Sequence, residues 1–229
     1  MLSLNMSNRH LKILLLGKSG MLGSCFLKHL QGLNCEVFAF NREELDVTDF
    51  GTLKSAFVKI KPDFVINCTG YTAVDDAETN RDFAFKINAE AVGRIAKFAE
   101  EYGATLIHFS TDYVFDGEKV DGYSEDDEPR PINVYGESKL AGERLIAENL
   151  EKFYIVRTSW LFGTNGKNFV DTMLKLGSEV IKNGRELKVV NDQVGSPTYT
   201  EDLCAAVIEN FVAFLDGGGD NQPFGIYHL

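Results

Sequence analysis

Short apolar runs alternate along the chain with stretches whose apolar residues recur every three to four positions. The first run, Leu11–Leu16, is almost continuously apolar, which is typical of a strand buried on both faces of a parallel sheet. The predicted strands are 11–16, 36–40, 63–68, 105–110 and 153–158, and the predicted helices are 21–31, 50–60, 82–102 and 135–149. This alternation indicates right-handed β-α-β units and therefore an α/β protein with a doubly wound parallel sheet, the Rossmann fold.

Beyond Trp160 the pattern is looser. It predicts helices at 168–182 and 200–215, strands at 186–190 and 225–229, and a glycine-rich loop at 217–222. We divide the chain into a polar lead, 1–10, which we expect to be disordered, a dinucleotide-binding domain, 11–160, and a partly interleaved substrate-binding lobe, 161–229. The chain ends on an apolar strand, so we expect this lobe to be short or truncated.

A glycine-rich turn joins the first predicted strand to the first helix. Gly17, Gly20 and Gly23 form the pattern G-x-x-G-x-x-G. Glycines at such positions permit a tight turn, close approach of the backbone to a pyrophosphate, and close packing of helix on strand. The letters GKS at 17–19 also resemble the end of a P-loop, but that motif requires a glycine where Lys12 lies. We therefore interpret the turn as a dinucleotide-binding loop.

The end of the second predicted strand indicates which dinucleotide is bound. Enzymes that prefer NAD usually place an acid there, against the adenosine ribose. Here the strand continues into Asn41 and Arg42, and a guanidinium is suited to pair with a 2′-phosphate. We therefore predict NADPH as the cofactor, with NADH tolerated, and place Asp46 and Val47 beside the adenine. The alternative is that Arg42 is a solvated loop cation.

Tyr135 and Lys139 form a Y-x-x-x-K pattern within a predicted helix. Residues four positions apart share one face of a helix, and a nearby ammonium favours the phenolate form of a tyrosine. Such a pair can deliver a proton to the alkoxide that forms when a ketone is reduced. The preceding strand ends in Ser110, Thr111 and Asp112, whose polar groups can bind the substrate oxygen. The alternative is an interface tyrosine beside a solvated lysine.

Composition narrows the partners and the compartment. The formal net charge of −11 gives the wrong long-range field for non-specific binding to nucleic acid or to an anionic membrane. No apolar run is long enough to span a bilayer, and the N-terminus lacks the apolar core of a signal peptide. The four cysteines show neither C-x-x-C spacing nor a nearby histidine cluster. We expect reduced thiols, no metal site and a cytoplasmic location.

Several longer segments carry a resemblance to a known family. They are GKSGMLG (17–23), CTGYTAVDDAE (68–78), STDYVFDG (110–117), NVYGESKLAGE (133–143), RTSWLFG (157–163) and NDQVGSPTYTEDL (191–203). Together they resemble the dTDP-4-dehydrorhamnose reductase family of extended short-chain dehydrogenases. The resemblance implies NAD(P)H-dependent reduction of the C4 keto group of dTDP-4-dehydro-L-rhamnose to dTDP-L-rhamnose, a precursor of cell-surface polysaccharides. A sugar nucleotide is then the small-molecule partner, and a homodimer is the candidate assembly.

The resemblance also implies roles for individual residues. The cofactor group comprises Gly20, Met21, Leu22, Asn41, Asp46, Val47, Thr69, Gly70, Tyr71 and, as a supporting residue, Asn88. The catalytic group comprises Thr111, Tyr135 and Lys139, with Tyr135 as the proton donor. Tyr135 and Lys139 are also predicted cofactor contacts, and the lysine can bond the nicotinamide ribose. Asp112 and Trp160 join Thr111 as sugar-nucleotide contacts, although Trp160 can instead be a core anchor at the strand end.

Two departures from the family pattern bear on activity. Family members usually continue for several tens of residues after the strand that matches GIYHL, so we expect this chain to bind the nucleotide more weakly. The loop after the third strand reads CTGY where two alanines are common.

Two other functions stay open. One is a sugar-nucleotide epimerase or dehydratase on the same fold, because Asp112 stands beside Thr111 and dehydratases use an acid there. The other is a non-catalytic regulatory subunit similar to the β subunit of methionine adenosyltransferase. The presence of Thr111, Tyr135 and Lys139 favours catalysis.

Overall fold

The computed structural model describes residues 10–184, 186–212 and 223–229. Six parallel strands form the main sheet in the order β2-β1-β3-β4-β5-β8. The strands are β1 (Leu11–Leu16), β2 (Cys35–Phe40), β3 (Phe64–Asn67), β4 (Thr105–Thr111), β5 (Phe153–Thr158) and β8 (Gly225–His228). The strand order reverses at β1, which lies between β2 and β3. In open α/β sheets, ligands bind at the carboxyl ends of the strands beside such a switch point.

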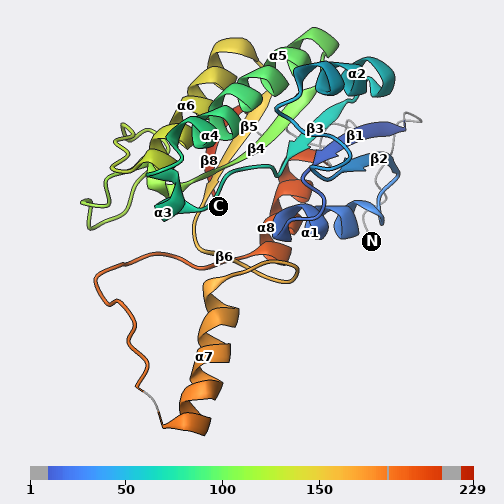
Figure 1. Ribbon diagram of the computed structural model, residues 1–229. Helices are drawn as coiled ribbons and strands as arrows, with labels where there is room; N and C mark the ends of the chain where they lie inside the picture. Colours follow the sequence, from blue (N-terminus) through green and yellow to red (C-terminus); the bar gives the residue numbers. More distant parts are fainter. Residues whose placement is uncertain (1–9, 185, 213–222) are drawn as a thin grey trace.

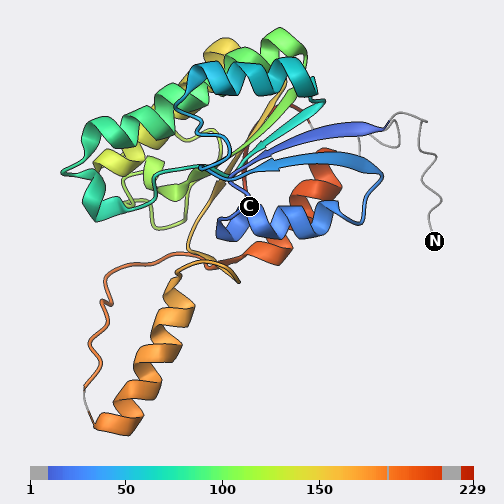
Figure 2. The same cartoon turned by 45° about the vertical axis from the view of Figure 1, so that its right-hand side comes forward.

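Helices cover both faces of the sheet, as Figures 1 and 2 show. One face carries α2 (Phe50–Ile60), α4 (Arg81–Phe85), the π-helix η1 (Lys86–Ala91), α5 (Val92–Tyr102) and α6 (Val134–Asn149). The other face carries α1 (Met21–Leu30), α8 (Thr200–Val207) and the π-helix η3 (Ile208–Val212). The short α3 (Val74–Ala77) and the 3-10 helix η2 (Asp112–Val114) lie in the loops after β3 and β4. This is the predicted doubly wound architecture.

The packing of β1 shows why its sequence is apolar at every position except Lys12. Leu14 and Leu16 pack in the cluster that contains side chains of α2, α5 and α6. Ile13 and Leu15 pack in the cluster that contains side chains of α1 and α8. Successive side chains of a strand point to opposite faces of the sheet. A strand covered by helices on both faces therefore needs apolar residues at both sets of positions.

The structure corrects several predicted elements. The predicted single helix 82–102 is divided into α4, η1 and α5. In the described part of the chain, residues 186–190 form no strand and are exposed, so that prediction was wrong. Residues 1–9 of the lead, the loop 217–222 and the end of the predicted helix beyond residue 212 lie outside the described residues.

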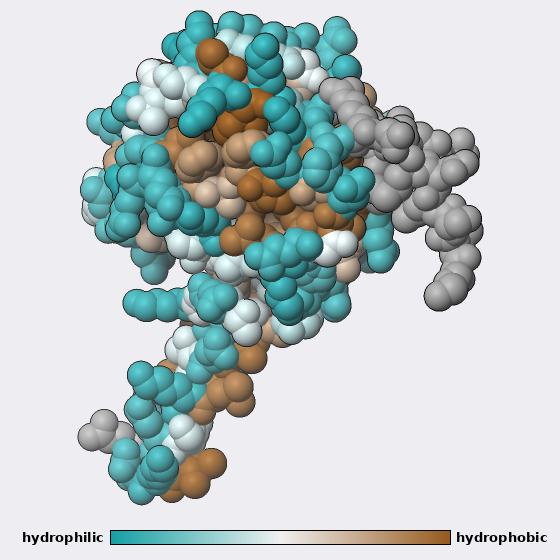
Figure 3. Space-filling model, turned by 90° about the vertical axis from the view of Figure 1, so that its right-hand side faces the viewer, coloured by the Kyte–Doolittle hydropathy of each residue, from teal (hydrophilic) through white to brown (hydrophobic). Residues whose placement is uncertain are grey.

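Part of the predicted C-terminal lobe lies in the main body, because β8 pairs with β5 and α8 packs against α1. The sequence did not predict the small sheet of β6 (Leu161–Phe162) and β7 (Thr198–Tyr199). Helix α7 (Phe169–Asn183) projects from the body (Figures 1 and 2). Within the described residues none of its side chains is buried, and Figure 3 shows hydrophobic side chains along the projecting part of the molecule that contains α7.

No helix among the described residues is both long enough and apolar enough to cross a membrane.

Candidate active site

The glycine-rich turn closes the carboxyl end of β1 against its two neighbouring strands. The backbone N–H of Gly17 donates to the Phe40 carbonyl of β2 at 2.9 Å, and the N–H of Cys68 donates to the Leu16 carbonyl at 3.0 Å. Gly17 has φ +86°, and a Cβ there would stand 3.0 Å from the Cys68 carbonyl group. A residue with a side chain would be strained by its backbone and would clash. Gly17 therefore places the turn at the switch point.

Gly20 and Gly23 meet different requirements. A Cβ at Gly23 would lie 2.1 Å from the Gly17 carbonyl oxygen, so this glycine permits α1 to pack on the turn. A Cβ at Gly20 would have only the Gly17 oxygen of the described atoms within 4 Å, at 3.5 Å. No side chain in the described residues caps α1 at Gly20, and the first N–H groups of a helix have no partner within it. The protein's own packing does not demand Gly20, whereas close approach of a phosphate does.

The Asn41–Val47 segment, after β2, differs from its sequence-based description. The Asn41 N–H donates to the Glu44 carboxylate at 2.9 Å, and the Glu44 N–H donates to Asn41 Oδ1 at 3.0 Å. The sequence indicated no acid at the end of β2, but this turn places the Glu44 carboxylate there. Its charge is paired with Lys18, at 2.7 Å. Arg42 is exposed and lies 3.5 Å from the Asp46 carboxylate. The side chain of Val47 is buried in the core, so a ligand can meet only its backbone.

Asn88 ties the loop after β3 to helix α6. Its Oδ1 accepts from the Tyr71 N–H at 2.8 Å, and its Nδ2 donates to the Tyr71 carbonyl at 3.0 Å and to Ser138 Oγ at 2.9 Å. Ser138 in turn donates to the Tyr135 carbonyl at 2.7 Å. Asn88 is fully buried, so it holds the loop of Thr69, Gly70 and Tyr71 beside the helix of Tyr135.

Helix α6 presents Tyr135 to the end of β4. The helix begins at Asn133, whose Oδ1 accepts from the Gly136 N–H at 2.8 Å. Burial raises the pKa of the Tyr135 phenol to about 12, a hydrogen bond with the Thr111 side chain lowers it, and the Asp112 charge raises it. Thr111 Oγ1 donates to Asp112 Oδ1 at 2.9 Å. The structure thus brings Tyr135, Thr111 and Asp112 together, with the phenol firmly protonated.

Lys139 lies on α6, but its amine contacts β4. Nζ donates to the Phe109 carbonyl at 2.6 Å and stands 3.3 Å from Nε2 of His108. Burial lowers the pKa of Lys139 to about 8, and the Glu143 carboxylate raises it. The sequence led us to expect an ammonium that lowers the pKa of the Tyr135 phenol. Here burial dominates both groups and moves the two pKa values apart.

A buried ion pair lies beside Lys139. Arg157 of β5 donates from Nε to Glu143 Oε1 at 3.0 Å and from Nη2 to Oε2 at 2.6 Å. Ser110 also donates to Glu143. Sequence reasoning missed this pair, as well as Asn67 and His108. The available signal was the presence of polar letters inside otherwise apolar strands, FVIN and TLIHFST.

Trp160 lies between the end of β5 and the start of β6. Its backbone has φ +45°, a strained conformation for a large side chain, and the residue is 38% exposed. A Cβ at Gly195 would stand 2.7 Å from the indole ring, so this glycine permits the contact. Close by in sequence, Thr158 Oγ1 is buried with no hydrogen-bond partner among the described residues.

A cavity of about 350 Å³ adjoins this end of the sheet. Its lining comprises Asp112, Phe115, Tyr123, Arg157, Thr158, Ser159, Ser196, Thr198, His228 and Leu229. Its lining therefore includes one predicted substrate contact, Asp112, and the residue Thr158.

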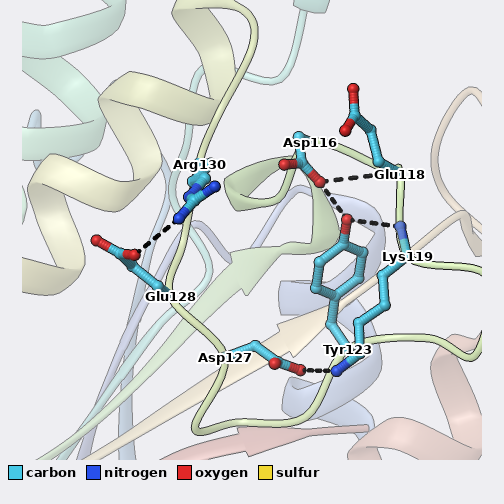
Figure 4. A pocket seen from close by; sticks show the side chains of 7 residues that line it. All are labelled: Asp116, Glu118, Lys119, Tyr123, Asp127, Glu128 and Arg130. Carbon is cyan, nitrogen blue, oxygen red and sulfur yellow. Dashed lines mark hydrogen bonds and ion pairs between the residues drawn. The ribbon is translucent and has the colours of Figure 1, made fainter.

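A second cavity, of about 400 Å³, lies within the loop between η2 and α6 (Figure 4). Its lining comprises Asp116, Glu118, Lys119, Tyr123, Asp127, Glu128 and Arg130. The cations are already paired, Lys119 with Asp127 at 2.6 Å and Arg130 with Glu128 at 3.1 Å. None of the predicted site residues lines this cavity.

One group of potential metal ligands occurs in the described residues, between α1 and α8. Ligand atoms of Cys25, His29 and Glu201 lie within 4.8 Å of one another. Glu201 already binds His29 at 2.7 Å and Lys28 at 2.9 Å. These contacts join the two helices, and we assign the group that structural role.

Comparison with known proteins gives consistent matches. The family model described as the RmlD substrate binding domain matches residues 11–229. The spore coat polysaccharide biosynthesis protein SpsK of Bacillus subtilis is 39% identical over 218 residues, which cover 95% of this chain and 72% of SpsK. A dTDP-4-dehydrorhamnose reductase of Escherichia coli is 41% identical over 225 residues, which cover 96% of this chain and 72% of that enzyme.

Solved structures agree. The crystal structure of dTDP-4-dehydrorhamnose reductase from Bacillus anthracis in complex with NADP has a TM-score of 0.87 and 38% identity. The match covers 96% of this chain and 74% of that one. The similarity therefore extends over almost the whole chain and is not confined to the glycine-rich turn.

Proposed function

The chain belongs to the dTDP-4-dehydrorhamnose reductase family, and from this premise we propose that it reduces the C4 keto group of dTDP-4-dehydro-L-rhamnose with NADPH. The observation that carries the proposal is the meeting of Thr111 with Tyr135 beside a glycine-rich turn that fits a pyrophosphate. The B. anthracis relative was crystallised with NADP, which supports the choice of cofactor.

The dinucleotide, when bound, supplies a hydride to the C4 carbon. Tyr135 donates its proton to the carbonyl oxygen, and its raised pKa keeps that proton in place until the oxygen becomes basic. The Thr111 hydroxyl, which donates to Asp112 in this structure, turns its proton to the same oxygen when the substrate binds and so fixes its position. Lys139, charged when the cofactor is bound, stabilises the phenolate that Tyr135 becomes.

The cofactor-binding residues divide by the part of the dinucleotide they would meet. The backbone N–H groups at Met21 and Leu22 are suited to the pyrophosphate, since they begin an uncapped helix. Gly20, whose own N–H donates to the Gly17 carbonyl at 3.1 Å, lets the phosphate approach the backbone closely. The Arg42 guanidinium is suited to the 2′-phosphate because it is exposed next to the strand tip. The loop of Thr69, Gly70 and Tyr71 lies between these groups and the catalytic tyrosine. Asn88 acts through that loop and is a positioning residue.

Asp112 and Trp160 are the proposed sugar-nucleotide contacts. Burial raises the pKa of the Asp112 carboxyl, which equips it to hold a sugar hydroxyl. The strained, half-buried Trp160 offers a ring face to the nucleotide. The free cysteines of the described residues suit a reducing, cytoplasmic compartment.

Product analysis tests this proposal. Incubation with the 4-keto sugar nucleotide and NADPH should consume one cofactor for each product molecule, and the product mass should increase by two hydrogens. A product that has lost water, with no net NADPH consumed, would identify a dehydratase. A new isomer of unchanged mass, separated from the substrate by chromatography and formed with no NADPH consumed, would identify an epimerase. Stable binding of a partner enzyme without turnover would favour a regulatory subunit.

A further inference from the structure

Lys139 has a buried histidine as its neighbour. Its amine is buried and lies 3.3 Å from Nε2 of His108, a histidine of β4 that is itself fully buried. An imidazole nitrogen offers a lone pair in one tautomer and an N–H in the other. The tautomer of His108 therefore decides whether this neighbour stabilises a charged lysine or an uncharged one.

Asn67 selects the tautomer. At the end of β3, its Oδ1 accepts from the Thr69 backbone N–H at 3.1 Å and from Thr69 Oγ1 at 2.6 Å. A backbone N–H can only donate, so the amide oxygen must face Thr69. The amide nitrogen then faces Nδ1 of His108, at 3.1 Å. Because an amide nitrogen also only donates, Nδ1 must be the acceptor and the hydrogen must be on Nε2.

His108 is neutral in this setting, because burial keeps the pKa of the imidazole well below its ordinary value. Its Nε2–H therefore points at the lysine amine. An ammonium would set two donors against each other, whereas an uncharged amine accepts from Nε2–H and still donates to the Phe109 carbonyl at 2.6 Å. The Nε2–H of His108 therefore finds an acceptor in Lys139 only when the lysine has lost its proton.

We propose that His108 is a positioning residue whose tautomer favours the uncharged form of Lys139 before the cofactor binds, so that cofactor binding is coupled to the uptake of a proton. This inference rests on the proposed function, because it requires the dinucleotide to bind beside Lys139. The negative charge and ribose hydroxyls of a dinucleotide give an ammonium the acceptors that His108 denies it.

The other charged groups near Lys139 do not override the effect of His108 on its protonation. Glu143 of α6 favours the ammonium, but Arg157 of β5 and Ser110 of β4 already occupy its oxygens. On the side of η2, Asp112 and Tyr113 act on the Tyr135 phenol. Burial lowers the pKa of Lys139 to about 8 against the opposing effect of the Glu143 charge, so a modest change at His108 moves its titration within an accessible pH range.

The first test measures NADPH affinity between about pH 7 and about pH 10, above the titration of the 2′-phosphate near pH 6. Wild-type affinity should weaken above about pH 8, approaching tenfold per pH unit. In His108→Gln the amide oxygen can turn toward Lys139 and accept from the ammonium. The weakening should then begin at higher pH, and the affinity lost by about pH 9.5 should be at least about threefold smaller. His29→Gln, a histidine of α1 outside the site, should behave as wild type.

Asn67→Asp should also give the Lys139 ammonium an acceptor, and it does so without changing residue 108. The carboxylate still accepts from Thr69 but no longer donates to His108, so the imidazole must carry its hydrogen on Nδ1 and turn a lone pair to Lys139. Its affinity profile should shift in the same direction as that of His108→Gln. Calorimetry of NADPH binding near pH 8.5, in two buffers of different ionisation enthalpy, should show proton uptake by wild type and less by either variant.

Nitrogen-15 NMR of the wild-type histidine side chains provides a test that needs no variant. His108 should show an unprotonated Nδ1 and a protonated Nε2. The opposite tautomer would overturn the inference, as would equal pH profiles in wild type, His108→Gln and Asn67→Asp, or the absence of proton uptake. Failure of wild type to bind NADPH at any pH would instead contradict the proposed function.

Discussion

At the scale of single residues, Lys139, which we propose is needed for reduction, lowers the free energy of unfolding because it is buried. Its folded-state pKa of about 8 lies below its ordinary value of 10.5, so folding disfavours the charged form. The penalty is fully present below about pH 8 and disappears as the pH rises past 10.5. Stability should therefore increase with pH across this interval. Lys139→Met should stabilise the fold at neutral pH by on the order of 2 kcal/mol while abolishing reduction.

Denaturant unfolding at several pH values measures this effect. The stability gap between wild type and Lys139→Met should narrow as the pH approaches 10.5. A variant that is less stable than wild type at neutral pH would show that the contact with the Phe109 carbonyl outweighs the buried charge.

Arg42 is the residue with which we associate preference for NADPH. Arg42→Ala should weaken NADPH binding by about tenfold and leave NADH binding almost unchanged, because only NADPH has the 2′-phosphate. Arg94→Ala is a matched control: both guanidinium groups lie over a phenylalanine ring, Arg42 at 5.7 Å from that of Phe83 and Arg94 at 5.0 Å from that of Phe50. Equal losses of NADPH and NADH affinity in Arg42→Ala would show that Arg42 supports the folded structure and does not bind the 2′-phosphate.

Sequence alone was informative where a residue's role follows from local spacing. The glycines at 17, 20 and 23 and the pair Tyr135 and Lys139 were visible as patterns. The contact between Asn67 and His108 was not, because it depends on β3 and β4 being neighbours in a register that pairs these two residues. Glu44 was missed at the β2 tip for a related reason: a turn brings it back to Asn41.

At the scale of elements, the packing of α6 on η1 holds Tyr135, the proposed proton donor. A Cβ at Gly142 would stand 2.1 Å from the Asn88 carbonyl oxygen. Gly142→Ala should therefore push the helix away and destabilise the protein by about 1–3 kcal/mol, despite the better helix propensity of alanine. It should also slow turnover, because Asn88 and Ser138 link the two elements to Tyr135.

Gly177 in α7 provides the contrast for this prediction. A Cβ there would meet nothing in the described residues within 4 Å. Gly177→Ala should raise stability by up to about 1 kcal/mol in the same denaturant experiment. Equal effects of the two substitutions would contradict the packing argument.

The η1 element also shows the limit of periodicity. Apolar spacing predicted one helix over 82–102, whereas the chain forms a π-helical turn at Lys86–Ala91. A π turn inserts one residue into an α-helix, which periodicity barely registers over so short a span. Tertiary contacts decide it here, since Asn88 bonds to both the loop after β3 and α6.

At the scale of the whole molecule, the alternation of strands and helices predicted the fold class correctly. It did not give the strand order, which places β1 beside β3 and so brings the glycine-rich turn and the Y-x-x-x-K helix to one edge of the sheet. It also predicted a strand at 186–190. That segment has apolar and β-branched residues, but no described strand pairs with it, and local pattern cannot reveal the absence of a partner.

The central claim is that Tyr135 is the proton donor in an NADPH-dependent reduction, and Tyr135→Phe tests it most directly. The rate of NADPH oxidation with the 4-keto sugar nucleotide should fall by at least about 100-fold, because the ring keeps its packing but loses its proton. NADPH affinity, measured on the same preparation, should remain within about threefold of wild type. An unchanged rate, with affinity intact, would contradict the account.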